Sequence, residues 1–315
     1  MKVLITGATG FIGKNLAKRC LAEGFEVVCG GRAIGKLDSF QDSMKTVYLD
    51  ILDRERLAEI FNEEKPDVVF HCAAYTKNTS IQALRKINVE GTRNVLDACM
   101  DAKIQKVIYL SSISVISGNP GVDLSDSSSY APLGTYGQSK IEAERLAVSY
   151  RDKGLKIAII RPTLVYGEDD SHWLFLVVSL LRFRVLPIVG DGANRYPLVY
   201  IQNLLDVMML AVFNDAAYEG TYIVSDKEAV TIKELFCYIS KICGFRSPIQ
   251  WPRFWATIIS CFPFPKSRSR IFTIDKICNI NRLEKSLGYT PKVSFYEGMQ
   301  RSLAAAIMHR RNNPL

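Results

Sequence analysis

The stretch Lys2-Val-Leu-Ile-Thr6-Gly7-Ala-Thr-Gly10-Phe-Ile-Gly13 decides the fold class of this chain. Its apolar start predicts a strand over residues 2–6, and the residues after the glycines predict a helix over 11–23. Glycines in the spacing GxxGxxG between a strand and a helix let the backbone approach a pyrophosphate, which the free N–H groups of the helix then bind. We therefore predict six cofactor-binding residues here: Gly7, Thr9, Gly10, Phe11, Ile12 and Gly13.

Short apolar runs and helical patterns alternate through the first half of the chain. After the first strand and helix, strands are predicted over 26–29, 68–71, 106–111 and 156–161, and helices over 53–63, 82–102 and 137–152. Buried strands that alternate with helices are typical of an α/β fold with a doubly wound parallel sheet, the Rossmann arrangement.

The second half of the chain is less regular, because eight prolines between positions 162 and 291 interrupt it. Such a region is more typical of a substrate lobe than of a second nucleotide-binding domain. We predict an NAD(P)-binding Rossmann domain over 1–166, to which 196–226 returns. A smaller, interleaved C-terminal substrate lobe is predicted from 167–195 and 227–315.

The end of the second strand indicates which dinucleotide is bound. A carboxylate there would accept a hydrogen bond from the ribose 2′-hydroxyl of NAD. Gly31 stands at that place instead, and the next residue, Arg32, could pair with a 2′-phosphate. The sequence thus favours NADP(H) over NAD(H). Farther on, we predict Asp50 and Ile51 as cofactor contacts, with Asp50 accepting a hydrogen bond from the adenine amino group. Asp53 is more simply the N-cap of the next helix.

The composition is that of an ordinary globular enzyme. The 315 residues include 40 basic and 32 acidic side chains, a net charge of +8, which suits an anionic ligand but is explained more simply by spare surface lysines. No nucleic-acid-binding motif is present, so no nucleic-acid partner is expected. Eight cysteines without a CxxC pair, and only three histidines, predict no metal site and indicate a reducing compartment.

The length of the apolar stretches indicates whether the chain could span or contact a membrane. No run reaches the roughly 20 apolar residues of a membrane helix, and no signal-peptide pattern is present, so we expect a cytoplasmic protein. Two shorter stretches, 173–181 and 251–265, stand out, and basic residues follow the second at Lys266, Arg268 and Arg270. This second stretch could make a peripheral contact with a membrane surface or, more simply, cover the pocket of a small-molecule substrate.

A tyrosine and a lysine with helical spacing carry the candidate chemistry. Tyr136 and Lys140 lie four residues apart at the start of a predicted helix, so they share one face. A phenol pKa of about 10 is too high for a base at neutral pH, but a nearby ammonium favours the phenolate. Ser112, which directly follows the strand over 106–111, could hydrogen-bond the same substrate oxygen. We predict Ser112, Tyr136 and Lys140 as the catalytic residues.

With these residues in view, the chain resembles the extended short-chain dehydrogenases/reductases, also called the NAD-dependent epimerase/dehydratase family. The resemblance covers nearly the whole chain, through motifs at 7–13, 71–74, 88–94, 161–167 and 287–298 together with Ser112, Tyr136 and Lys140. It implies a Ser-Tyr-Lys mechanism and a homodimer formed through the helices around 88–102 and 137–152. It also implies further cofactor contacts from Ala73, Ala74, Asn88, Lys140, Pro162 and Val165, and substrate contacts from Thr76, Ser114, Tyr166 and Arg195.

Departures from the family pattern separate its reactions. Sugar-nucleotide dehydratases of this family usually carry an acidic pair beside the catalytic serine, where this chain has Ile113 and Ser114, so dehydration is disfavoured. Epimerases of the family place an arginine on the diphosphate. Here Arg195 comes one position early, which on a strand points a side chain to the opposite face. The acidic pair that follows is replaced by Gln202-Asn203, which further weakens the epimerase interpretation.

Aromatic residues are frequent over 245–272. In this respect the chain resembles the 3β-hydroxysteroid dehydrogenase-like branch of the family more than the branches that act on sugar nucleotides. They could line an apolar pocket or form the core of a small lobe. The leading hypothesis is an NAD(P)-dependent oxidoreductase that interconverts a secondary alcohol and a ketone. The alternatives are a nucleotide-sugar epimerase with tightly bound NAD and a non-catalytic nucleotide-binding scaffold.

Overall fold

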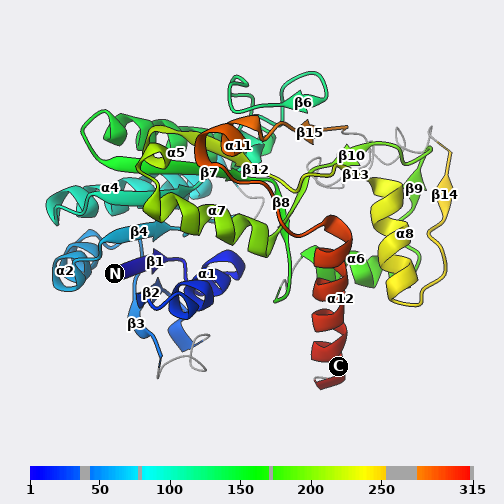
Figure 1. Ribbon diagram of the computed structural model, residues 1–315, viewed down its shortest axis with the longest axis horizontal. Helices are drawn as coiled ribbons and strands as arrows, with labels where there is room; N and C mark the ends of the chain where they lie inside the picture. Colours follow the sequence, from blue (N-terminus) through cyan, green and yellow to red (C-terminus); the bar gives the residue numbers. More distant parts are fainter. Residues whose placement is uncertain (36–42, 77–79, 170–172, 253–274, 313–315) are drawn as a thin grey trace.

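The computed structural model describes residues 1–35, 43–76, 80–169, 173–252 and 275–312. Its centre is a seven-stranded sheet in which every neighbouring pair is parallel (Figure 1). The strand order is β12 (Thr221–Val224), β7 (Lys156–Pro162), β5 (Lys106–Leu110), β4 (Val68–His71), β1 (Lys2–Thr6), β2 (Glu26–Gly31) and β3 (Lys45–Tyr48). The predicted doubly wound parallel sheet is confirmed. The edge strands β3 and β12 were not among the predicted strands.

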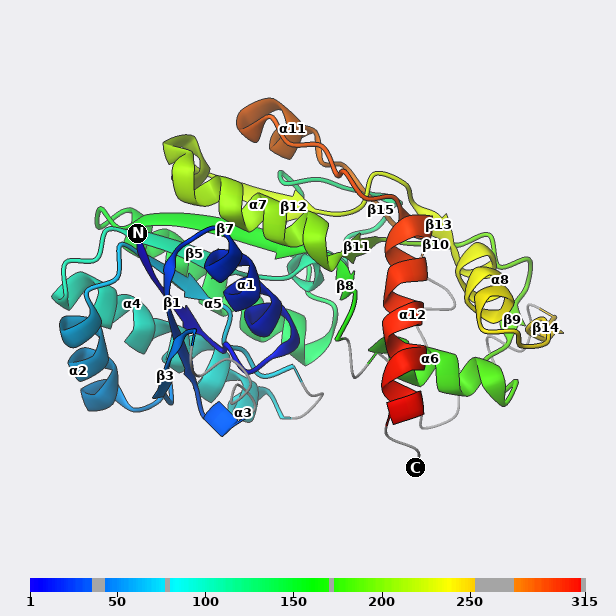
Figure 2. The ribbon, with the colours of Figure 1, turned by 60° about the horizontal axis from the view of Figure 1, so that its bottom comes forward.

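Helices cover both faces of this sheet (Figures 1 and 2). On one face lie α1 (Phe11–Ala22) and α7 (Ile201–Phe213), and on the other α2 (Arg54–Glu64), α4 (Gly91–Asp101) and α5 (Gly134–Arg151). Successive strand residues alternate between the two cores: Val3 and Ile5 pack with α1 and α7, while Leu4 packs with the other three helices. Because both faces are buried, the strands read as nearly continuous apolar runs.

The order in which successive strands are added to the sheet reverses between β1 and β4. From β1 the chain proceeds to β2 and β3 on one side, whereas β4, β5 and β7 follow on the other. In open parallel sheets, ligands bind at the carboxyl ends of the strands beside such a switch point. The glycine stretch after β1, and Ser112 after β5, both lie at this edge of the sheet.

The helix predicted over 82–102 has an irregular centre. The structure shows α3 (Ile81–Arg85), a wide π-helical turn η2 (Lys86–Glu90) and then α4 without a break in the chain direction. Asn88, in the wide turn, is buried, and its side-chain amide bonds both the N–H and the carbonyl of Tyr75. Wide turns of this kind often occur at functional sites, and here the turn aims Asn88 into the protein.

A second group of elements lies beside the strand ends (Figure 1). It holds the helices α6 (Trp173–Arg182), α8 (Ile232–Ile242) and α12 (Phe295–Asn312). Short ladders accompany them: β9 (Ile188–Val189) with β14 (Gln250–Trp251), and β10 (Arg195–Tyr196) with β13 (Val230–Thr231). Between this group and the sheet, β8 (Leu164–Tyr166) pairs with β11 (Leu198–Tyr200). The division of the chain into two interleaved domains stays a prediction.

Smaller elements complete the fold. The strand pair β6 (Asp123–Leu124) and β15 (Ile277–Cys278) joins segments far apart in sequence, and α11 (Asn281–Leu287) follows it. Short 3-10 helices are η3 (Ile113–Val115) and η4 (Asp215–Glu219).

The apolar stretches singled out in the sequence have different outcomes. The stretch 173–181 lies in α6, whose buried side consists of Leu174, Val177, Val178 and Leu181. Among the described helices, none has the length and apolar character needed to cross a bilayer. Most of the stretch 251–265, and the basic residues Lys266, Arg268 and Arg270, lie outside the described residues.

Candidate active site

The glycine turn after β1 is folded tightly against neighbouring backbone. Gly7 has a φ of +73°, which favours glycine, and a Cβ there would lie 2.7 Å from the Cα of Ala73. A Cβ on Gly13 would lie 2.3 Å from the carbonyl oxygen of Gly7. Neither position can carry a side chain unless the backbone moves, so both glycines are required for the turn.

Gly10 shows the opposite environment, as a phosphate site requires. It is the N-cap of α1 without a side-chain cap, and an added Cβ would meet only the Gly7 oxygen, at 3.3 Å. The space before the helix is therefore open to a ligand, and Gly10 offers no side-chain acceptor to the first N–H groups of α1. Phe11 lies beside Gly167, whose added Cβ would be 3.4 Å from the ring. These residues fit the pyrophosphate of a dinucleotide.

The end of β2 shows how the predicted adenosine contacts are arranged. Gly31 is buried, and a Cβ there would lie 2.9 Å from the methyl group of Thr9, while Arg32 beyond it is exposed. Asp50 accepts a hydrogen bond from the Leu52 N–H, at 3.0 Å. The side chain of Ile51 is buried in the core, so this residue presents only backbone to a ligand.

Two further sequence expectations concern this region. Asp53 caps α2 by accepting from the Arg56 N–H at 3.0 Å, as predicted. Pro162 is buried at the end of β7 and Val165 is half-buried in β8, on the segment that continues past the sheet edge. Ala73 is half-buried and Ala74 exposed directly after β4.

The start of α5 is pressed against the serine segment that follows β5. A Cβ on Gly137 would lie 2.6 Å from the Ser114 carbonyl oxygen, and the Leu133 N–H donates to the same oxygen at 2.9 Å. Glycine at position 137 thus lets the helix approach this closely. The approach brings Tyr136, in the first turn of α5, into a side-chain hydrogen bond with Ser112.

The hydrogen bonds of Ser112 determine where its proton can go. Its Oγ accepts from the Ser114 N–H at 3.2 Å and from the Ser114 hydroxyl at 2.9 Å. Because a hydroxyl oxygen has two lone pairs, the Ser112 proton is left to donate to Tyr136 or to a substrate oxygen. Burial raises the pKa of Tyr136 to about 12, opposed by the bond with Ser112. Tyr136 is therefore protonated at neutral pH in this form.

Lys140 lies one turn farther along α5 and is almost fully buried, with 1% of its surface exposed. Its Nζ donates to the Leu110 carbonyl at 2.7 Å and lies 4.4 Å from the ring centroid of Tyr109. Burial lowers the pKa of Lys140 to about 7, opposed mainly by the charge of Glu144. Its charge thus depends on the groups packed around it.

His71, at the end of β4, is a neutral structural residue. Its Nδ1 lies 2.7 Å from the Thr6 hydroxyl, and its Nε2 lies 2.9 Å from the Thr92 hydroxyl. Since Thr92 donates its proton to the Asn88 carbonyl, we assign the histidine proton to Nε2. Burial, and next the charge of Lys140, lower the pKa of His71 to about 3.

Asn88 connects this network to α5. In addition to its bonds with Tyr75, its amide donates to the Ser139 hydroxyl at 2.9 Å, and Ser139 donates to the Tyr136 carbonyl at 2.8 Å. Polar contacts therefore run from Thr6 at the glycine turn to the backbone of Tyr136. In this structure the side chain of Asn88, which the resemblance placed among the cofactor contacts, is bonded within the protein.

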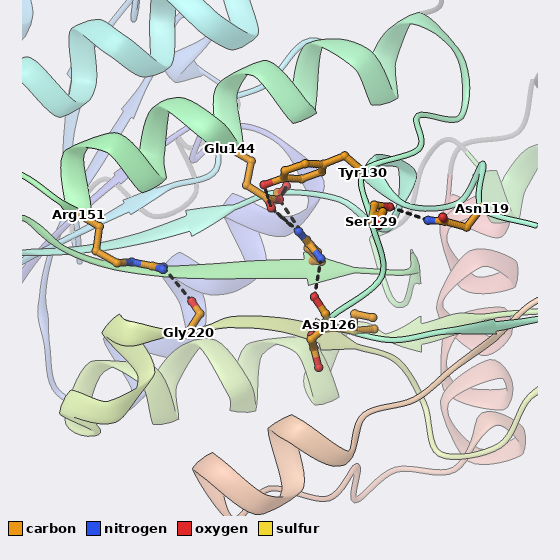
Figure 3. A network of polar contacts seen from close by, with 10 residues as sticks. Asn119, Asp126, Ser129, Tyr130, Glu144, Arg151 and Gly220 are labelled. Carbon is orange, nitrogen blue, oxygen red and sulfur yellow. Dashed lines mark hydrogen bonds and ion pairs between the residues drawn. The ribbon is translucent and has the colours of Figure 1, made fainter.

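A buried carboxylate beneath the site was missed in the sequence (Figure 3). Glu144 is fully buried and accepts from the hydroxyl groups of Ser111, at 2.6 Å, and Tyr130, at 2.8 Å. It also pairs with Arg161 through both Nε and Nη2. The available signal was its position four residues after Lys140, which puts it on the same helix face.

The predicted substrate residues lie in several settings. Ser114 is half-buried and bonded to Ser112, and Thr76 is exposed after β4. Tyr166 is fully buried against Tyr200, and its hydroxyl donates to Asp226 at 3.0 Å. A substrate would reach Tyr166 only if this packing opened, so the structure does not support a substrate contact there.

Arg195 is also engaged within the protein. Its Nε and Nη2 each lie 3.0 Å from one carboxylate oxygen of Asp275, and its backbone N–H donates to the same side chain. The interpretation of Gln202-Asn203 needs correction as well. Asn203 is fully buried. Its side-chain amide donates hydrogen bonds to the Asp226 carboxylate and the Val293 carbonyl, and its side-chain oxygen accepts from the backbone N–H groups of 292 and 293. This position is structural and says nothing of the substrate.

The model of the NAD dependent epimerase/dehydratase family matches residues 3–224. A 4-hydroxy-2-methyl-3-oxo-4-farnesyl-3,4-dihydroquinoline-1-oxide ketoreductase from Stigmatella aurantiaca is 25% identical, with 95% of each chain covered. A 3 beta-hydroxysteroid dehydrogenase/Delta 5-->4-isomerase from Mycobacterium tuberculosis is 27% identical, over 92% of this chain and 86% of that protein.

Among solved structures, UDP-glucose 4-epimerase from Thermotoga maritima matches with a TM-score of 0.82 and 22% identity, covering 98% of this chain and 99% of that one. This likeness concerns the fold alone. Together with the glycine turn and the Ser112–Tyr136 contact, the family match leads to one conclusion. The chain belongs to the NAD-dependent epimerase/dehydratase family, the extended short-chain dehydrogenases/reductases.

Proposed function

We propose that this protein is an NADP(H)-preferring oxidoreductase that interconverts a secondary alcohol and a ketone. The observation that carries the proposal is the placement of Ser112, Tyr136 and Lys140 at the sheet edge that also holds the glycine turn. The dinucleotide, when bound, supplies the chemistry of hydride transfer. The residues of this chain orient the reacting oxygen and move its proton.

Tyr136 and Ser112 act on the substrate oxygen. With a pKa of about 12, Tyr136 carries a proton at neutral pH and donates it to the oxygen of a ketone as that oxygen gains charge. Ser112 has its lone pairs occupied by Ser114, so it also donates to that oxygen. The form described here is therefore arranged for ketone reduction, since the reverse reaction requires the phenolate of Tyr136.

The preference for NADP(H) rests on Gly31 and Arg32. A carboxylate side chain at position 31 would start 2.9 Å from the Thr9 methyl group, whereas the next residue, Arg32, is exposed and carries a guanidinium that suits a 2′-phosphate. We expect Arg32→Asp to raise the ratio of NADH to NADPH use at least tenfold. An unchanged ratio of kcat/KM values would remove the NADP(H) assignment.

The substrate class is a bulky apolar hydroxy or keto compound. The ketoreductase and hydroxysteroid dehydrogenase relatives are named for ketone and alcohol chemistry on large apolar molecules, and both align over nearly the whole of this chain. The absence of an acidic pair at Ile113 and Ser114 supports redox chemistry rather than dehydration. We further propose a homodimer through the helices around 88–102 and 137–152, which the molar mass from light scattering would test.

The function is tested by following NADPH consumption with a panel of bulky apolar ketones. Tyr136→Phe should lower turnover by at least about 10²-fold and leave dinucleotide affinity within about twofold, because it removes only the proton donor. Turnover that survives this change contradicts the mechanism. Heat denaturation of protein purified without added cofactor distinguishes the alternatives. Near-stoichiometric release of NAD supports the nucleotide-sugar epimerase, and dinucleotide binding without any turnover supports the non-catalytic scaffold.

A further inference from the structure

Tyr109 occupies an unusual position beneath α5, the helix that carries Tyr136 and Lys140. It lies on β5 directly opposite His71 on β4, so both rings are on the sheet face that α4 and α5 cover. The ring is fully buried, and its hydroxyl has no hydrogen bond of ordinary geometry among the described residues. The Thr92 hydroxyl lies near it, but its proton goes to the Asn88 carbonyl and one of its lone pairs to His71, so only its remaining lone pair faces Tyr109. A buried hydroxyl without a well-formed hydrogen bond is unfavourable, so the stabilising contacts of Tyr109 are those of its ring.

The ring of Tyr109 has a specific neighbour. The Nζ of Lys140 lies 4.4 Å from the ring centroid, well inside the roughly 6 Å range of a cation–π interaction. The ring is also stacked with His71, at 5.6 Å between centroids and 26° between planes. The ammonium also donates a hydrogen bond to the Leu110 carbonyl on the same strand. Two adjacent residues of β5 therefore contact the Lys140 ammonium.

Other titratable groups near Lys140 do not replace this contact. Glu144, one turn along α5, is already bonded to Arg161, Ser111 and Tyr130. Burial raises the pKa of Cys72 to about 12 and lowers that of His71 to about 3, so neither carries a charge near neutral pH.

Tyr136, on the same helix face, is protonated near neutral pH because burial raises its pKa to about 12. With these groups neutral or already paired, the ring of Tyr109 remains as a direct partner of a desolvated ammonium.

We propose that Tyr109 is a positioning residue, whose ring face keeps the buried Lys140 ammonium charged and in place one turn from Tyr136. Its importance for turnover rests on the proposed function, whereas its coupling to Lys140 is a property of the folded chain. Loss of the ring face should lower the pKa of Lys140 by about one unit, the size expected for a desolvated cation–π contact.

The coupling is tested by urea unfolding between pH 5 and 10, with Tyr109→Phe and Tyr109→Leu each made alone and with Lys140→Met. A lysine with a pKa of about 7 in the folded chain and about 10.4 in the unfolded chain makes stability rise with pH between those values. Tyr109→Leu should move the start of this rise from about pH 7 to about pH 6, and Tyr109→Phe should leave it in place. Lys140→Met should abolish it in every background.

Two results would overturn the proposal: equal pH profiles for the phenylalanine and leucine variants, or a difference between them that persists with Lys140→Met. If Tyr109→Leu does not fold, the comparison uses phenylalanine and pentafluorophenylalanine at position 109, which match in shape but differ in the charge of the ring face. In turnover assays the same shift should appear in the pH profile of kcat. Absence of any turnover contradicts the proposed function and leaves the unfolding test decisive.

Discussion

Two buried carboxylates, Glu144 beneath the candidate active site and Asp226 where the second group of elements meets the sheet, are held in different ways. Glu144 is paired with the buried guanidinium of Arg161 and bonded to two hydroxyl groups (Figure 3). Asp226 has only neutral donors among its described hydrogen-bond partners: the Tyr166 hydroxyl, the Asn203 amide and the Tyr200 N–H. Burial raises the pKa of Asp226 to about 6.

This difference separates a charge-compensated site from a pH-sensitive junction. The ion pair between Arg161 on β7 and Glu144 on α5 joins these two elements and compensates the buried charge. The junction carries an acid that titrates near the lower end of the physiological range. We therefore expect the Asp226 junction to respond to pH between about 4 and 6, below the range in which Lys140 at the sheet edge titrates.

The largest expected effect comes from breaking the ion pair. Arg161→Met leaves the Glu144 carboxylate buried without its cation and should destabilise the protein by about 3–5 kcal/mol. Urea unfolding at pH 7 measures this loss, and Arg56→Met, in the exposed pair with Glu59 on α2, is the matched control with little expected change. If both variants lose the same stability, the two ion pairs do not differ as described.

Asp226→Asn sharpens the other half of the comparison. An acid with a folded pKa of about 6 and an unfolded pKa of about 3.9 binds its proton more tightly in the folded chain. Stability therefore falls as pH rises from about 4 to 6, by about 3 kcal/mol, and stays lower above that range. The amide variant should lack this fall. Unfolding free energies measured at pH 4 and pH 7 test it, and an unchanged difference between them contradicts the assignment.

The smallest expected effect is at the partly exposed pair of Arg195 and Asp275. Both side chains are about one-third exposed, so Arg195→Ala should cost only about 0–1 kcal/mol of stability. This variant also tests the earlier expectation that Arg195 contacts substrate. A rise in KM of tenfold or more, without loss of stability, would show that the guanidinium leaves Asp275 to bind substrate.

Much of the sheet edge could be predicted from the sequence, because its features are local. The glycine turn, the capping by Asp53 and the spacing of Tyr136 and Lys140 each depend on residues a few positions apart. The wide turn at Asn88 could not be predicted, since the backbone of Tyr75 that Asn88 contacts belongs to a separate loop.

In the second half of the chain, residue roles depended on distant partners. Tyr166 was expected to face the substrate and instead packs against Phe295 and bonds Asp226, 60 positions away. Arg195 pairs with Asp275, 80 positions away. No local pattern identifies such partners, because a polar side chain that becomes buried bonds whichever donor or acceptor the packing brings near.

The sequence by itself determined the alternating strands and helices, the dinucleotide turn and the helix face that carries Tyr136 and Lys140. These follow from strand and helix periodicity and from the steric needs of glycine. Only the tertiary structure decided which charges are compensated. Lys140 meets the Tyr109 ring, Glu144 meets Arg161, and Asp226 meets no cation among the described residues. The physical reason is that burial removes water from each charge, and the partner that replaces it comes from another element of the fold.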